Sequence, residues 1–114
     1  MSAGGPRHRA RQSLLTLTGH VAGLYPGARK RLTIVVRNRT QNALRIRSVT
    51  TRVRDAGPAC RRRNLRVSSF RGRLRVSPRR ARRIAVTVSM RRDAPTACQG
   101  ALFPLVFRGR ATRR

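Results

Sequence analysis

Acid–base and nucleophilic catalysis need carboxylates, histidines or activated nucleophiles, and this sequence of 114 residues contains few of them. Its two acids are Asp55 and Asp93, and its two histidines are His8 and His20. Each aspartate precedes an alanine and a nearby proline, a composition typical of turns. The sequence contains no nucleophile elbow, phosphate-binding loop or calcium-binding loop. These residue types predict that the protein is not an enzyme and has no small-molecule substrate.

Two cysteines, Cys60 and Cys98, lie in turn-like segments. We favour a disulfide between them, because closing a loop of this length would stabilise a small domain by about 4 kcal/mol. Two separate buried thiols are the alternative. A zinc site would need His8 and His20 to join both cysteines, but the sequence has neither CxxC nor HxxxH spacing. We therefore expect no metal and no other cofactor.

The charge of the chain is extreme, with 29 basic residues against two acids and a formal net charge of +27. Lys30 is the only lysine, so nearly all of this charge is arginine. Arginine offers planar, bidentate donors that suit phosphate, sulfate or carboxylate groups. Such a surface attracts polyanions and repels itself. A coding bias towards arginine is the alternative explanation of the same composition.

Three arginine clusters lie in or beside predicted turns and are the candidate polyanion-binding residues. They are Arg61, Arg62 and Arg63; Arg79, Arg80, Arg82 and Arg83; and Arg91 and Arg92. If these clusters converge at one end of the fold they form a site, whereas scattered clusters form only a diffuse basic surface. The few aromatic residues argue against base stacking, so we expect contact with phosphates rather than with base sequence.

The elements that must position these residues have the period of β-strands. Apolar residues alternate with polar ones over 32–37 and 84–90, and shorter segments of the same kind lie near 65–67 and 74–76. Within 44–53 the apolar parity flips near Ser48, which predicts a bulge or a crossing between sheets. About seven short strands without a helical period predict an all-β, immunoglobulin-like β-sandwich.

The boundaries of this domain follow from composition. Residues 1–13 are small, polar and basic and are expected to form a mobile arm, which leaves residues 14–112 for the sandwich. The segment 101–107, ALFPLVF, is apolar on both faces and is expected to be the most buried strand. Pro104 within it cannot donate to a ladder, which indicates an edge or a bulge. No apolar run is long enough to span a bilayer.

The turn LYPG at 24–27, the two cysteines and the segment ACQG at 97–100, which leads into FPL at 103–105, carry a family resemblance. Together they resemble immunoglobulin-like domains that are common in secreted and surface proteins of actinobacteria, over about residues 14–112. The resemblance implies a two-sheet sandwich with Cys60 joined to Cys98, used as a non-catalytic structural or adhesive module outside the cytoplasm. It does not imply a defined ligand.

Two departures from that family bear on function. Arginine stands on the outer faces where typical members have threonine, serine or alanine, and no export signal is recognisable near the amino end. A cytoplasmic or particle-associated location therefore stays open. The leading hypothesis is a structural module of a surface or particle assembly that docks on a polyanion, namely a wall polymer, an acidic lipid surface or an acidic protein. A nucleic-acid-associated accessory of the ribosome or nucleoid is the alternative, and a passive spacer is the third.

Overall fold

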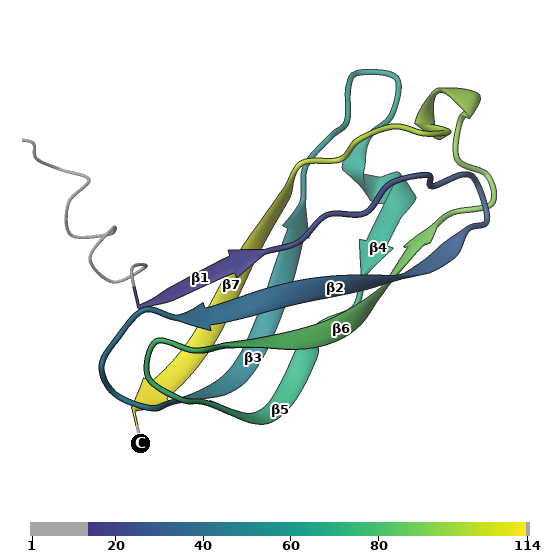
Figure 1. Cartoon of the computed structure of the whole chain (residues 1–114). Helices are drawn as coiled ribbons and strands as arrows, with labels where there is room; N and C mark the ends of the chain where they lie inside the picture. The colour runs from purple at the N-terminus through teal and green to yellow at the C-terminus, as the bar shows by residue number, and fades with distance from the viewer. Residues whose placement is uncertain (1–13, 114) are drawn as a thin grey trace, which may run out of the picture.

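Two antiparallel β-sheets packed face to face make up the chain in this computed structural model, which describes residues 14–113 (Figure 1). The predicted arm at 1–13 lies outside the described residues. The larger sheet has the order β1 (Leu15–Thr18), β2 (Arg29–Asn38), β6 (Ala81–Met90), β4 (Leu65–Val67). The smaller sheet has the order β5 (Phe70–Val76), β3 (Leu44–Val53), β7 (Leu105–Arg113). The predicted seven-stranded all-β sandwich is confirmed.

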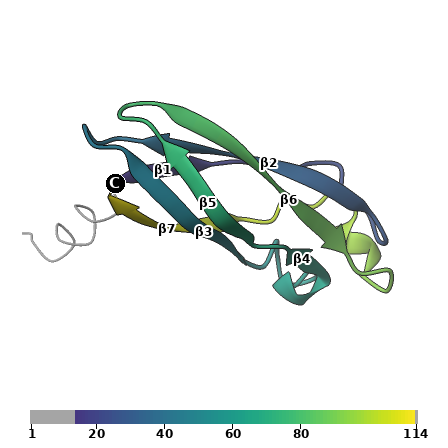
Figure 2. The same ribbon diagram turned by 90° about the horizontal axis from the view of Figure 1, so that it is seen from below.

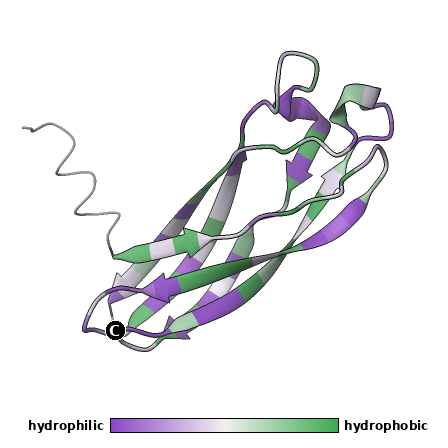
Figure 3. Cartoon of the chain, turned by 45° about the horizontal axis from the view of Figure 1, so that its top comes forward, coloured by the Kyte–Doolittle hydropathy of each residue, from purple (hydrophilic) through white to green (hydrophobic). Residues whose placement is uncertain are grey.

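The core lies between the sheets and is built by the predicted alternation. Leu32, Ile34 and Val36 of β2 are fully buried, and β6 contributes Ile84 and Val88 beside them. Hydrophobic and hydrophilic residues alternate along the strands in Figure 3, as expected when one face of each sheet is buried. The arginines of the strands take the exposed positions, so the charge lies outside the core.

The predicted change of parity in β3 is a β-bulge. The register of β3 shifts between Ile46 and Ser48 against both β5 and β7. Leu44 and Ile46 are buried before the shift, and Val49 is buried after it. The extra residue turns the later side chains over and keeps the apolar ones facing the core.

The prediction that 101–107 is the most buried strand is wrong. Strand β7 begins only at Leu105, and its residues alternate between half-buried and exposed. Leu102 before it is 72% exposed and Val106 is 41% exposed. The physical reason is that β7 is an edge strand of the smaller sheet and packs mainly against the four-residue β1 of the other layer. The edge position is what Pro104 indicated.

Connections between the strands close the sandwich at two ends, which are seen from another side in Figure 2. Two 3-10 helices, η1 (Arg62–Asn64) and η2 (Thr96–Cys98), lie at the end where β6 finishes. We call this the disulfide end. The β2–β3 and β5–β6 connections lie at the opposite end, here called the turn end (Figure 1). Among the described residues, no helix is long and apolar enough to cross a membrane.

Candidate polyanion-binding surfaces

The disulfide end is fastened by a bond between Cys60 and Cys98, whose Cα atoms are 5.2 Å apart. This confirms the predicted pairing and excludes the two separate thiols. Both residues are buried, and the bond links the segment before η1 to η2. Because both sulfur atoms are in the disulfide, neither is available as a zinc ligand. Within residues 14–113, no group of three or more histidine, cysteine or acidic residues could hold a metal ion.

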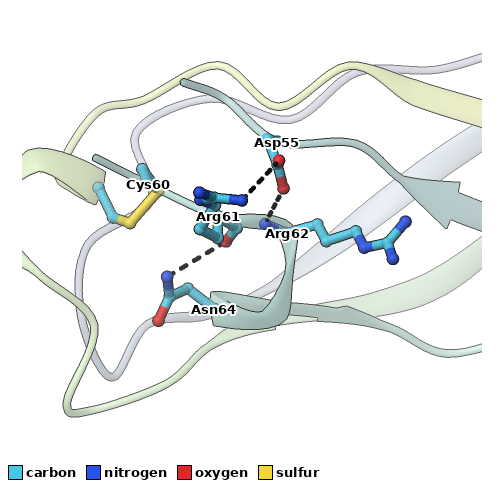
Figure 4. Close-up of a disulfide and its surroundings, with 6 residues drawn as sticks. Asp55, Cys60, Arg61, Arg62 and Asn64 are labelled. Carbon is cyan, nitrogen blue, oxygen red and sulfur yellow. Dashed lines mark hydrogen bonds and ion pairs between the residues drawn. A yellow bond between two sulfur atoms is a disulfide. The ribbon is translucent and has the colours of Figure 1, made fainter. Parts of the chain in front are cut away.

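The first arginine cluster is positioned by Asp55 (Figure 4). The backbone N–H of Arg62 donates to Asp55 Oδ1 at 2.7 Å, and Arg61 Nη1 lies 3.8 Å from Asp55 Oδ2. The buried Asn64 donates from Nδ2 to the carbonyl oxygen of Arg61 at 3.1 Å. The side chain of Arg62 extends away from Asp55. The backbone is therefore held while the Arg62 guanidinium stays available.

The cluster at Arg91 and Arg92 joins this group. The backbone N–H of Arg91 donates to the carbonyl oxygen of Asn64 at 3.0 Å. Its guanidinium donates from Nε and Nη2 to the two carboxylate oxygens of Asp93, at 2.9 and 3.0 Å. These hydrogen bonds, and then the positive charge of Arg91, hold the pKa of Asp93 below its ordinary value. Part of the positive charge at the disulfide end is therefore compensated.

A groove of about 600 Å³ opens beside these residues, and arginines line it. The arginines are Arg62, Arg63, Arg66 and Arg91. Arg66 was not among the predicted residues, because its place beside Ser89 depends on the pairing of β4 with β6. Thr51 also lines the groove, and its hydroxyl is buried without a hydrogen-bond partner in the described part of the chain.

The remaining cluster, Arg79, Arg80, Arg82 and Arg83, lies at the turn end. The turn from Ser77 to Arg80 closes with a hydrogen bond from the Arg80 N–H to the Ser77 carbonyl at 3.1 Å. Strand β6 spans ten residues between this turn and Arg91, which is roughly 30 Å at the rise of a β-strand. The predicted clusters therefore form two groups at opposite ends and do not converge into one site.

A third basic surface covers the outer face of the β5–β3–β7 sheet, and it includes none of the arginine clusters predicted from the sequence. The residues that alternate with the inward-facing ones are Arg45, Arg47 and Arg52 of β3, Arg71, Arg73 and Arg75 of β5, and Arg108 and Arg110 of β7. We call this set the arginine face. Arg45 lies directly opposite Arg75, and Ser48 lies between Arg71 and Arg110. Neither aspartate of the sequence lies on these strands.

The centre of the outer face of the larger sheet differs in composition from the arginine face. Thr33 lies opposite Ala85 there, Arg31 lies opposite Thr87, and the outer residues of β1 are threonines. Arginine pairs with small neutral residues on this face instead of with arginine. The signal for the difference was present in the sequence as alternating arginines, but only the strand order shows which of them share a sheet.

A scan against protein-family models finds no matching family, and neither the curated proteins nor the solved structures contain a match to this chain.

Proposed function

We propose that this chain is a non-catalytic structural module that docks on a polyanion through the arginine face. The supporting observation is the placement of arginine on all three strands of one sheet, with both acids of the sequence at the disulfide end. Side chains directly opposite each other in a sheet have Cβ atoms about 5 Å apart, so the Arg45–Arg75 pair is repulsive in the free protein. A bound row of anionic groups would relieve this repulsion, and this relief would favour binding to the arginine face.

Binding on this face would depend on charge and hydrogen bonding. Phe70 and Phe107 have the inward parity of their strands and pack against the core, and Val106 is the exposed apolar residue among the arginines. Base stacking has no aromatic platform here. A phosphate or sulfate polymer would be held through its repeating anions, and base sequence would matter little.

The surface or particle assembly that we propose as the setting is supported by two observations. A disulfide is typical of oxidising compartments, and the resemblance to immunoglobulin-like surface domains agrees with it. A nucleic-acid accessory would use the same arginine face, so the ligand series in the experiment below separates the two settings.

The test compares two variants that remove equal charge from opposite faces. Arg71→Ser/Arg73→Ser/Arg75→Ser changes β5 on the arginine face, and Arg29→Ser/Arg31→Ser/Arg37→Ser changes exposed arginines of β2 in the larger sheet. Binding to heparin, duplex DNA and poly(glycerol phosphate) is titrated at several salt concentrations. The β5 variant is expected to bind on the order of 100-fold more weakly near 0.1 M salt, with a salt slope lower by about three.

The β2 variant is the control, and it should lose only the long-range part of the attraction. Melting curves of both variants show that each is folded. Equal losses in the two variants would show that the charge acts as a diffuse field and that the arginine face is not a site. Tighter binding to poly(glycerol phosphate) than to DNA at equal salt would favour the surface setting, and the reverse order would favour the nucleic-acid setting.

A further inference from the structure

The edge of β7 that faces away from β3 has no strand partner among the described residues. The Arg54 N–H donates to the Pro104 carbonyl at 2.9 Å, so these two residues form a hydrogen-bonded pair. Such pairs alternate along an antiparallel ladder. Val106 and Arg108 therefore direct their backbone groups towards β3, whereas Phe107 and Gly109 direct theirs to the free edge. The main-chain donors and acceptors of Phe107 and Gly109 are available to another strand.

An open groove runs along this edge between the two layers. Its volume is about 920 Å³, and its apolar lining includes Leu15 and Leu17 of β1 with Phe107 and Ala111 of β7. These side chains are only half-buried, in contrast to the fully buried residues of β2 and β3. At Gly109 the methyl groups of Leu15 and Leu17 approach the backbone of β7 closely, since an added Cβ would lie 3.1 and 3.3 Å from them.

Arginines line the outer side of the same groove. Arg47, Arg108 and Arg110 lie along it, and Arg108 and Arg110 alternate in β7 with the inward-facing Phe107 and Gly109. A second copy of the chain pairing at this edge would bring arginine against arginine, at a formal charge of +27 per chain. Charged residues on an edge strand oppose self-association in this way. The same residues favour a strand of opposite charge.

We propose that the free edge of β7 binds an extended acidic segment of a partner protein by strand addition. The segment would pair with the backbone groups of Phe107 and Gly109. Side chains of an added strand point alternately to the two faces of the sheet, so apolar residues would enter the groove beside Leu15 and Leu17. The intervening acidic residues would face Arg108 and Arg110. This proposal goes beyond polyanion docking, because it requires a peptide backbone with alternating apolar and acidic side chains.

The experiment uses the full chain, labelled with ¹⁵N, and two nine-residue peptides of identical composition. In one peptide valine and aspartate alternate, and in the other the valines and aspartates are in separate blocks. The alternating peptide is expected to bind at least tenfold more tightly and to slow hydrogen exchange at the Phe107 and Gly109 amides. Equal binding of the two peptides, or binding without this protection, overturns the proposal.

Two variants separate this site from the arginine face. Ala111→Phe fills the groove without a change of charge, so it should weaken the alternating peptide at least tenfold and leave heparin binding unchanged. The β5 triple variant should weaken heparin and leave the protection of Phe107 and Gly109 by the peptide intact. Loss of peptide binding in the β5 variant alone would assign the peptide to the arginine face and reject the groove.

Other occupants of the edge give distinct results before any peptide is added. If the Phe107 and Gly109 amides are already protected in the monomer, a segment of the chain itself covers the edge and the proposal is overturned. Protection that rises with protein concentration, together with a dimer in sedimentation, assigns the edge to a second copy and also overturns it.

Discussion

The two ends of the sandwich contain similar residues, but different interactions hold them in place. Each end has a buried asparagine, a group of arginines and a turn with proline in second place. At the disulfide end, Asn64 makes one side-chain hydrogen bond, and the covalent bond and both aspartates lie nearby. At the turn end, the fully buried Asn38 makes five hydrogen bonds, and no acid lies near the arginines of residues 79–83 in the described structure.

This difference shows two ways to hold a strongly charged loop in place. The disulfide end combines a covalent link with ion pairs, which compensate part of its charge. The turn end depends on Asn38, which joins the end of β2 to the carbonyl groups of Asn42, Val76 and Ser77. The arginines of the turn end keep their full charge. Substitutions at matched positions of the two ends should therefore have unequal effects.

The largest effect is expected from removing the covalent link. The double variant Cys60→Ala/Cys98→Ala should lower the free energy of unfolding by about 4 kcal/mol, because it releases a loop with a sequence separation of 38 residues in the unfolded chain. Chemical denaturation of this variant and of the reduced wild type should give similar values. A loss below about 1 kcal/mol would mean that the disulfide end is held mainly by its noncovalent contacts.

The next largest effect is expected at the turn end. Asn38→Ala should cost about 3 kcal/mol, because the buried hydrogen bond to the Val76 carbonyl and the partly buried one to the Ser77 carbonyl both lose their donor. Asn64→Ala is the matched control at the disulfide end and should cost about 1 kcal/mol, since one side-chain hydrogen bond is lost there. Denaturant midpoints with unchanged m-values measure both. The reverse ranking would show that hydrogen-bond number does not distinguish the two ends.

A smaller effect of opposite sign is expected in the paired turns. Pro26 and Pro78 occupy the second positions of turns closed by hydrogen bonds from Ala28 to Tyr25 and from Arg80 to Ser77. The third position is Gly27 at the disulfide end, with φ of 88°, and Arg79 at the turn end, with φ of 62°. A side chain is strained at positive φ. Arg79→Gly should therefore stabilise the protein by about 1 kcal/mol.

Two controls isolate the backbone strain from the loss of charge. Arg79→Ala removes the charge and keeps the strain, so it should stabilise less than Arg79→Gly. Gly27→Ala should destabilise by about 1 kcal/mol, because alanine is strained at a φ of 88°. The nearest atom to the added Cβ, Arg92 Cγ, is 3.6 Å away, so no clash adds to this strain. If Arg79→Ala and Arg79→Gly have equal stability, charge rather than φ decides the effect at the turn end.

Much of the fold could be predicted from the sequence, because strands and bulges are marked by the alternation of apolar and polar residues that are close together in the chain. Period-two alternation located β2, β3 and β6, and the parity change in β3 located the bulge near Ser48. The cysteines were correctly paired, since a single disulfide is the only one that two cysteines allow. The burial of the last strand was wrong, because apolar composition does not reveal that β7 lies at an edge under a four-residue strand.

The candidate surfaces could not be predicted in the same way, because they depend on which strands lie side by side in the folded protein. Adjacent arginines in the sequence suggested clusters, but antiparallel β6 places Arg82 and Arg91 at opposite ends of the sandwich. The arginine face is distributed over three strands with one arginine at every second position or less, so no run of sequence marks it. Only the order β5–β3–β7 brings Arg75, Arg45 and Thr112 into one row.

The smallest expected effect concerns pH and separates the two ends by their acids. Hydrogen bonds and charge from Arg91 lower the pKa of Asp93, so the ionised carboxylate is favoured in the folded state. The stability from this pair is present above the aspartate pKa of the unfolded chain, about 3.9, and is lost as pH falls through the lower folded value. Asp93 is fully exposed, so solvent screening keeps the effect small. The difference in stability between wild type and Asp93→Asn should therefore be constant from about pH 7 to pH 5 and vanish at the acid end of the titration.

An NMR titration of the Asp93 carboxyl carbon should give a midpoint below 3.9. A midpoint at or above that value would mean that Arg91 and Asp93 are not paired in solution, and Asp55 would then be the acid that compensates arginine charge at the disulfide end.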